Sequence, residues 1–600
     1  MRRQDTIRSA NDSRGLQKHL RLVVVALLLI ANATIAVAGE PVVNSRPPSP
    51  RENGALPDTV VVCPEGFREA LAPWLLHRRQ QGHNITVIPP RPDKDALRND
   101  IRGIAAAGSL KTIVLIGDTA TPYDGRQQRH LPTHHAEAKV NVHFGSTDTI
   151  ATDNWFADLD DDDLPDVAIG RLPADAAADL TAMVKKIITY ETSTDFSPWR
   201  RKVNVVAGVG GFGVLADSLV ESSTKWFLTA SVPSAYRVSM TYGNWRSPYC
   251  PLPETFAAQT RERLNEGSLF WVYIGHGMPR FLDTIRVPGG QYPILSTRDV
   301  SQIDCQHGSP IAVFLSCYAG AYDLAEDCLG EELLRKPGGP VAVLASSRVA
   351  LPYGLGVLSS ELLSECFVRR RETLGEMLLE AKRQSMSDGA GDVRRRMLDT
   401  MSKAISPVEA TPADERREHL HLVNLLGDPL LRLRQPQPVE LETPKRTIAG
   451  EEVEIAFDAP LAGKATVELV VRRDRLRVRP QPRYKYEVSP AAMAQFAETY
   501  RAANDPSYLT RKIDVQPGRT TLSLPVPPEA SGVCHIQVYL EGADGHAMGS
   551  SNISIRRPVQ ESPVQESPAK VSSAAVSAAG VGKGRSLKAA STSQASATSR

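Results

Sequence analysis

The sequence predicts an α/β region with a parallel sheet in two halves, followed by an all-β sandwich. Up to about residue 435, strand-like and helix-like segments alternate with short joints bounded by glycine, and after about residue 436 apolar and polar residues alternate. A chain of 600 residues is also too long for one hydrophobic core. Apolar residues make up 42% and charged residues 23% of the chain, which is typical of globular proteins. The formal net charge of +2 gives no reason to expect a nucleic-acid partner.

The N-terminus has the pattern of a secretory signal peptide. Basic residues precede the apolar run LVVVALLLIANATIAVA, which ends in an A-V-A triplet before Gly39. The alternative is an uncleaved anchor, but the run is short beside the roughly 20 apolar residues of a membrane span. We therefore expect residues 1–38 to be removed on export, with no integral membrane domain left in a secreted, periplasmic or cell-surface protein. Residues 39–57, rich in Pro, Arg and Asn, are predicted to be a linker.

Residues 58–199 are predicted to form a first α/β subdomain. The strands expected here are TVVVCP, NITVIPP and KTIVLIGD, and the helices between them are FREALAPWLLHRRQQG and DALRNDIRGIAAAG. Gly82 and Gly108 end these two helices. Alternation of this kind indicates βαβ units and a parallel sheet.

Residues 200–435 repeat the alternation and are predicted to form a second α/β subdomain. Its expected strands are KVNVVAGVGG, SLFWVYIGHG, PIAVFLSCYAG and GGPVAVLASSR, with helices such as FAAQTRERLNEG and EELLRK between them. The pattern leaves two arrangements open, namely two consecutive α/β units or one long sheet in two halves.

Residues 436–556 are predicted to form a small antiparallel sandwich of the immunoglobulin-like type. EVEIAFDAP, KATVELVVRR, TTLSLPVP and HIQVYLEG alternate apolar and polar residues, with PAAMAQFAETYRAAND as a helical insertion. Residues 557–600 contain almost no large apolar side chain, so they are expected to be a disordered tail.

Two buried-looking strands of the second subdomain end in reactive side chains. LFWVYIGHGMPR stops at His276, and PIAVFLSCYAGAYD places Cys317 at the corresponding point of the next strand. Ligands of open α/β sheets bind beyond the carboxyl ends of the strands. If the two strands are neighbours, their side chains emerge side by side, and the 41 residues from His276 to Cys317 leave room for the one crossover that this needs.

A thiol beside an imidazole can act as a nucleophile, because the imidazole takes the thiol proton. Gly275 and Gly277 leave room for a substrate, and the amides of Gly277 and Cys317 could face a developing oxyanion. A single His or Cys at a strand end is more often structural. Both together, on consecutive strands with small flanking residues, favour catalysis.

These motifs resemble the catalytic core of the gingipain-like cysteine peptidases, which share a fold group with caspases and legumains. The resemblance rests on GHG and SCYAGAYD, on TDNWFADLDDDDLPDVAIGRLP and KKIITYE upstream, and on GGPVAVLASS and NLLGDPLLRL downstream. It covers roughly residues 57–435 and implies a caspase-like fold. By the same resemblance Cys317 is the nucleophile, His276 the general base and acid, and the Gly277 and Cys317 amides the oxyanion hole.

The sequence departs from this family at one point. Some members have a carboxylate after the strand that corresponds to KVNVVAGVGG, where it orients the histidine. The segment AGVGGFGV contains no acid. The nearest carboxylates are Asp217 and Glu221 on the following helix, where an acid could instead line a pocket for a basic P1 residue.

The segment ADLDDDDLPD is a candidate site for a hard cation. Asp158, Asp160, Asp162 and Asp166 have a spacing that suits a loop wrapped around calcium, although the glycine and final Glu of an EF-hand are absent. The alternatives are a solvated acidic turn or ion pairs within the chain. Any calcium here would be structural, and no cofactor is expected to be needed for catalysis.

The leading prediction is an exported cysteine endopeptidase that acts on protein or peptide substrates. One alternative is a transpeptidase of the same chemistry, in which an amine replaces water, and another is a surface-binding protein on a weakly active peptidase fold. Seven cysteines are an odd number, so at least one thiol stays unpaired in the chain, and Cys317 is the candidate. The sequence does not indicate an oligomeric state.

Overall fold

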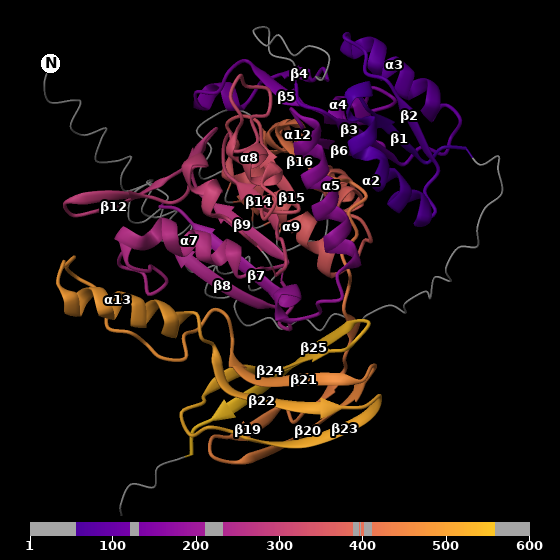
Figure 1. Ribbon diagram of the computed structural model, residues 1–600. Helices are drawn as coiled ribbons and strands as arrows, with labels where there is room; N and C mark the ends of the chain where they lie inside the picture. Colours follow the sequence, from indigo (N-terminus) through magenta and orange to yellow (C-terminus); the bar gives the residue numbers. More distant parts are fainter. Residues whose placement is uncertain are drawn as a thin grey trace, which may run out of the picture.

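The computed structural model describes residues 56–119, 131–209, 232–305, 307–387, 395–396, 398–400, 402 and 411–558. The predicted signal peptide, most of the predicted linker and nearly all of the predicted tail lie outside these ranges. Within them the chain forms an α/β region followed by a β-sandwich, and the sandwich lies below the α/β region in Figure 1. The predicted α/β fold followed by an all-β region is therefore confirmed.

The α/β region is built on one sheet of ten strands. In spatial order these are β2 (Ile85–Ile88), β1 (Thr59–Val62), β3 (Thr112–Ile116), β6 (Ala168–Leu172), β16 (Val423–Leu426), β15 (Ala342–Ser346), β14 (Ile311–Leu315), β9 (Phe270–Ile274), β7 (Lys202–Ala207) and β8 (Arg237–Tyr242). Of the two arrangements that the sequence left open, the structure has one continuous sheet in two halves.

The two halves run in opposite directions and meet at β16. Strand β16 is parallel to β6 and antiparallel to β15, whereas the other neighbours in each half are parallel to one another. Strand β16, near the end of the α/β region, therefore completes the half of the sheet that contains the first strands of the chain.

Helices cover both faces of the first half, as the alternation of buried side chains on its strands requires. Val60 and Val62 belong to a core cluster with Leu97 and Ile101 of α3, whereas Val61 of the same strand packs in the large core with Trp74 of α2. The helices of the region are α2 (Arg68–Gln80), α3 (Lys94–Ala105), α4 (Asn154–Ala157), α5 (Ala177–Thr192), α7 (Phe256–Asn265), α8 (Leu329–Arg335), α9 (Pro352–Phe367), α10 (Leu374–Met386) and α12 (Pro412–Leu422).

Among the described residues, three short hairpins lie outside the main sheet. They are β4 (His134–Glu137) with β5 (Thr149–Thr152), β10 (Gly277–Met278) with β11 (Phe281–Leu282), and β12 (Thr284–Val287) with β13 (Gly290–Pro293). The β10–β11 hairpin follows β9 directly and begins at the second glycine of the GHG motif.

The C-terminal region has two sheets with a core of its own between their strands. The larger sheet contains β17 (Gln437–Pro438), β25 (His546–Arg556), β24 (Gly532–Glu541), β21 (Gly463–Val471), β22 (Ser507–Val515) and β19 (Arg446–Ile448). The smaller sheet contains β18 (Leu441–Glu442), β20 (Glu452–Ala459) and β23 (Gly518–Pro525). The expected helical insertion is α13 (Pro490–Ala503). The sandwich is confirmed, and its immunoglobulin-like character stays a prediction.

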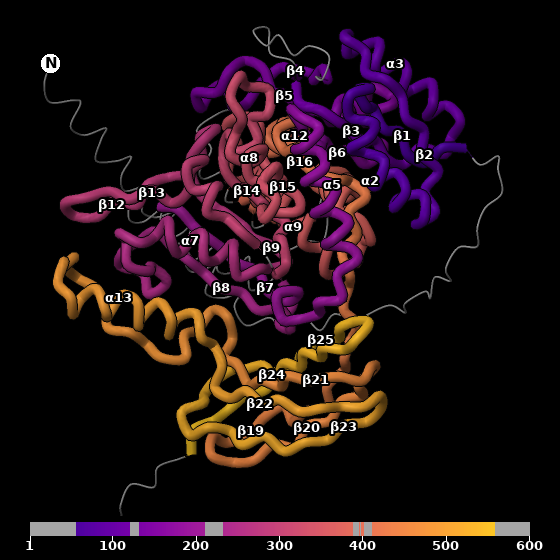
Figure 2. Tube along the Cα trace, in the orientation of Figure 1, coloured from indigo at the N-terminus to yellow at the C-terminus, as the bar shows by residue number. Residues whose placement is uncertain are grey.

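The sandwich packs firmly against the α/β region. The buried carboxylate of Glu468 accepts hydrogen bonds from Arg201 at 2.8 Å and from Arg237 at 2.5 Å, across the boundary. The Asn504 side chain accepts a hydrogen bond from the Met240 amide and donates one to the Met240 carbonyl oxygen. It thereby covers the open edge of β8, and the tube in Figure 2 shows α13 beside β8. An open strand edge invites pairing with other chains, so this contact protects the sheet.

In the part of the chain that the structure describes, no helix is both long and apolar enough to cross a membrane. All seven cysteines lie within the described ranges, and all seven are free thiols.

Candidate active site

The register of two neighbouring strands brings His276 and Cys317 to the same edge of the sheet. Strands β9 and β14 are parallel neighbours, and their last paired residues are Ile274 and Leu315. His276 and Cys317 each lie two residues beyond this pair, at the carboxyl ends of strands that are about 4.8 Å apart. His276 is exposed and Cys317 is partly buried, so both can be reached from solvent.

Gly277 is needed for the close approach of the two strand ends. A Cβ atom at this position would lie 2.5 Å from the Cys317 carbonyl oxygen and 2.8 Å from Ser316 Oγ, closer than real Cβ contacts. Gly275 has a φ of +156°, and a Cβ there would lie 2.7 Å from the Tyr273 hydroxyl. Gly277 therefore lets the histidine segment pack against the cysteine segment, and Gly275 leaves room for the Tyr273 hydroxyl.

Cys317 differs from the other six cysteines in its exposure. Its Sγ lies 3.4 Å from the Ala350 amide nitrogen, which donates a hydrogen bond to it, and 3.6 Å from the Ala350 carbonyl oxygen. Burial nevertheless raises the pKa of the Cys317 thiol, so the sulfur is protonated at neutral pH. The other six cysteines are buried, and burial raises the pKa of Cys63, for example, to about 12. Cys317 is thus the accessible thiol of the molecule.

The segment after Cys317 is held in a turned conformation. Tyr318 has a φ of +56°, in the left-handed region that a tyrosine rarely adopts, and its amide donates to the Arg348 carbonyl oxygen. Arg348 in turn donates to both carboxylate oxygens of Asp323, at 2.8 and 2.6 Å. These hydrogen bonds from Arg348, with one from His135, hold the pKa of Asp323 well below its usual range. The charged pair ties the loop that follows Cys317 to the segment after β15.

Asp217 and Glu221, the predicted pocket carboxylates, lie outside the described residues. The carboxylate of Asp283 lies beside the end of β7, although the AGVGG segment at that end contains no acidic residue. A Cβ atom at Gly208 would be 3.5 Å from Asp283 Oδ2. The Asp283 amide and the Tyr273 hydroxyl both donate to the His276 carbonyl oxygen. Sequence reasoning missed these two residues, because Tyr273 reads as an ordinary core residue of a strand and Asp283 follows no motif.

The acidic loop brings together three of its four predicted ligands. One carboxylate oxygen from each of Asp158, Asp160 and Asp166 lies within 4.8 Å of the others. Atoms that bind one calcium ion at about 2.4 Å can be at most about 4.8 Å apart, so the three carboxylates fit that ion. Asp162 is not in this group, and its carboxylate accepts from the Leu164 amide instead. Arg98 also pairs with Asp158 at 3.2 Å, which offsets part of the negative charge.

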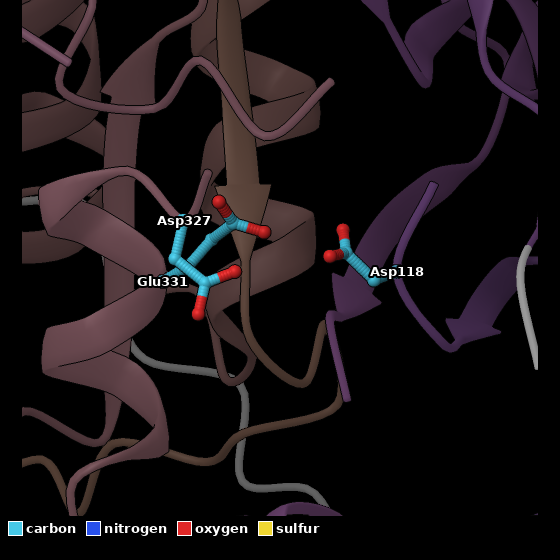
Figure 3. Close-up of side chains that lie close together, drawn as sticks. All are labelled: Asp118, Asp327 and Glu331. Atoms are coloured by element: carbon cyan, nitrogen blue, oxygen red, sulfur yellow. The ribbon is translucent and has the colours of Figure 1, made fainter. Parts of the chain in front are cut away.

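A second acidic group, which the sequence analysis did not single out, joins the two halves of the sheet. Asp118 follows β3, Asp327 lies just before α8 and Glu331 lies in its first turn, and Figure 3 shows the Asp118 carboxylate facing the other two. Arg335 pairs with Asp118 at 3.2 Å and with Asp327 at 2.6 Å, and it lies 3.6 Å from Glu331. Because a guanidinium already contacts all three carboxylates, this group is an internal ion-pair network.

An α/β sheet with a thiol and an imidazole at the carboxyl ends of neighbouring strands has the arrangement of a cysteine peptidase. Comparison with known families gives the same class, since the sequence model of peptidase family C25 matches residues 53–434. The chain belongs to peptidase family C25.

Individual relatives are distant. Lys-gingipain W83 of Porphyromonas gingivalis is 22% identical over 300 residues, which are 48% of this chain and 15% of that relative. A Lys-gingipain from another strain of the same organism is 21% identical over the same share. The chain therefore spans only a small part of the length of these curated relatives. The crystal structure of the Arg-specific cysteine proteinase gingipain R is similar to 85% of this chain and 100% of its own, with 15% identity and a TM-score of 0.48.

Proposed function

We propose that this protein is an exported cysteine endopeptidase in which Cys317 and His276 form the catalytic pair. The observation that carries the proposal is the register of β9 and β14, which puts an accessible thiol and an exposed imidazole on equivalent positions of neighbouring strands. Family membership supports the reaction class. Export is supported by the signal-peptide pattern of residues 1–38.

The reaction follows from the protonation state of the Cys317 thiol. Because the Cys317 thiol is protonated at neutral pH, His276 acts as a general base and takes the proton as the sulfur attacks the peptide carbonyl carbon. The amides of Gly277 and Cys317 donate to the oxyanion that forms. His276 then gives the proton to the leaving amine, and an acyl-enzyme remains on Cys317. Water, deprotonated by His276, attacks the acyl carbon and releases the second product with the thiol restored.

The proposal is tested with a mixed peptide library and iodoacetamide. The purified protein is expected to cleave library peptides, and iodoacetamide is expected to modify Cys317 first and to stop cleavage in step with that modification. Since burial raises the pKa of this thiol, the alkylation rate should keep rising with pH up to at least pH 9. Cleavage that continues after complete modification of Cys317 would refute the mechanism. The same library reports the P1 preference, and a basic P1 residue is expected if Asp217 or Glu221 lines the pocket.

We also propose that the acidic loop binds a structural calcium ion through Asp158, Asp160 and Asp166. Removal of the ion with a chelator is expected to lower the melting midpoint by roughly 5 °C, because a ligand that binds only the folded state stabilises it. Asp160→Asn is the matched variant, since it removes one ligand charge. Its melting midpoint should lie below that of the wild type in calcium and should respond less to the chelator. A wild-type midpoint that is identical with and without chelator contradicts the calcium site.

A further inference from the structure

The carbonyl oxygen of His276 is held by two donors from different elements. The hydroxyl of Tyr273, three residues earlier on β9, donates to it at 2.7 Å. The amide of Asp283, which follows β11, donates to the same oxygen at 3.2 Å and lies 3.4 Å from the Tyr273 hydroxyl. A carbonyl oxygen has two lone pairs, so both bonds can form together.

Two glycines leave the space that the Tyr273 hydroxyl occupies. Tyr273 is fully buried, and the hydroxyl lies between the backbones of Gly208 and Gly275. A Cβ atom would come within 2.9 Å of this hydroxyl at Gly208 and within 2.7 Å at Gly275. Burial, together with the charge of Asp283, raises the pKa of the tyrosine, so the hydroxyl keeps its proton and remains a donor.

The hydrogen bonds to the His276 carbonyl oxygen also fix the peptide unit that joins His276 to Gly277. The peptide unit between His276 and Gly277 is planar and trans, so its carbonyl oxygen and the Gly277 N–H point in opposite directions. In the β10–β11 hairpin Gly277 is opposite Leu282, while the Asp283 amide bonds to His276. Antiparallel hydrogen-bonded positions alternate along a strand, so the Gly277 N–H is turned away from β11. Gly277 itself packs on the Cys317 carbonyl oxygen.

We infer that Tyr273 is a positioning residue that sets the direction of the Gly277 N–H, and thereby aligns the oxyanion hole, by holding the His276–Gly277 peptide plane. The inference rests on the proposed peptidase function and adds to it a residue that contacts neither substrate nor sulfur. In this arrangement the Tyr273 hydroxyl, from β9, and the Asp283 amide together hold the His276 carbonyl oxygen, and the oxyanion donor Gly277 N–H belongs to the same peptide unit.

The test is Tyr273→Phe, which removes only the hydroxyl. Loss of a whole oxyanion donor costs about 10²–10³-fold in kcat, and here the Asp283 amide still holds the carbonyl, so we expect kcat to fall about tenfold with KM nearly unchanged. Affinity for a peptide aldehyde, whose adduct with Cys317 carries an oxyanion, should fall by a similar factor. The matched control is Tyr190→Phe, because the buried Tyr190 hydroxyl has no hydrogen-bond partner in the described part of the chain. This control should keep wild-type kinetics.

Alkylation of Cys317 by iodoacetamide separates positioning from general damage, since that reaction forms no oxyanion. We expect its rate at pH 9 to be the same in Tyr273→Phe and in the wild type. Replacement of Tyr273 by 4-aminophenylalanine restores a donor at the same place and should recover most of kcat, even if Tyr273→Phe lowers the melting midpoint. An unchanged kcat in Tyr273→Phe overturns the inference, and so does an equal loss in alkylation and cleavage. If Cys317→Ala cleaves peptides as fast as the wild type, the proposed function itself fails, which is a separate outcome.

Discussion

Cys317→Ala is expected to lower peptide cleavage by about 10⁴-fold or more, with no change in fold. Single removal of a covalent nucleophile costs this much because the remaining groups cannot form the acyl-enzyme. The substitution removes one sulfur atom at a partly exposed position, so the melting midpoint should move by less than about 2 °C. Initial rates on a fluorogenic peptide taken from the cleaved library, measured with matched protein concentrations, give the comparison.

Cys534→Ala is the control for loss of a thiol elsewhere in the chain. Cys534 is buried in β24 of the sandwich, and burial raises its thiol pKa to about 11, so it is a poor nucleophile. This variant should cleave peptides at the wild-type rate. If it lost activity as fully as Cys317→Ala, or if Cys317→Ala kept activity, the assignment of the nucleophile would be wrong.

Arg335→Gln is expected to cause the largest loss of stability among the substitutions considered. The guanidinium is the shared partner of Asp118, Asp327 and Glu331, and it also pairs with Asp175 at 2.8 Å. Asp118 and Glu331 are almost completely buried. Removal of one partner of a buried ion pair leaves an uncompensated charge and costs about 3–5 kcal/mol. Since the network joins β3 of one half to α8 of the other, the whole α/β region should melt at a lower temperature.

The loss of stability caused by Arg335→Gln should increase with pH. Burial, together with repulsion from nearby carboxylates, raises the pKa of Asp118, Asp327 and Glu331 above their usual values, although Arg335 lowers them in part. Carboxyls with raised pKa bind protons on folding, so stability falls as pH rises above about 4, where the same groups ionise in the unfolded chain. Without Arg335 these pKa values rise further, so the fall in stability continues to a higher pH. The difference in melting midpoint from the wild type should therefore be larger at pH 8 than at pH 5.

Arg280→Gln serves as the control for the arginine network. Its side chain is 41% exposed and pairs with Glu326 at 3.1 Å and with Glu332 at 3.3 Å. Exposed ion pairs contribute about 0–1 kcal/mol, so this variant should melt close to the wild type at both pH values. A pH-independent loss in Arg335→Gln would show that the guanidinium acts through packing alone.

Much of the fold could be predicted because strands buried on both faces leave a strong sequence signal. TVVV, FWVYI and IAVFL appear as uninterrupted apolar runs, and each forms a strand of the main sheet. The adjacency of β9 and β14 was also predictable, since consecutive elements are usually neighbours in space. The order of the remaining strands was not, because pairing between β16 and β6 joins residues more than 250 positions apart and no local pattern encodes it.

In the candidate site, the positions of His276 and Cys317 could be predicted from the sequence, but the contacts that support them could not. His276 and Cys317 stand at the ends of recognisable strands, and the small residues around them are visible in the sequence. The contacts of Tyr273 and Asp283 with the His276 carbonyl depend on a hairpin that folds back over β9, and a single tyrosine within an apolar run carries no sign of such a contact. The Arg335 network was hidden for a similar reason, because its members come from both halves of the sheet.

The central position of β16 has a consequence for the order in which this chain can fold during its synthesis. Strands β6 and β15 both pair with β16, and β16 is made of residues 423–426. A nascent chain that contains His276 and Cys317 but ends before residue 423 would have two unpaired edges in the middle of its sheet. Unpaired edges of this kind are prone to association with other chains. Peptidase activity should therefore appear late in synthesis, and products truncated before β16 should aggregate rather than digest their surroundings.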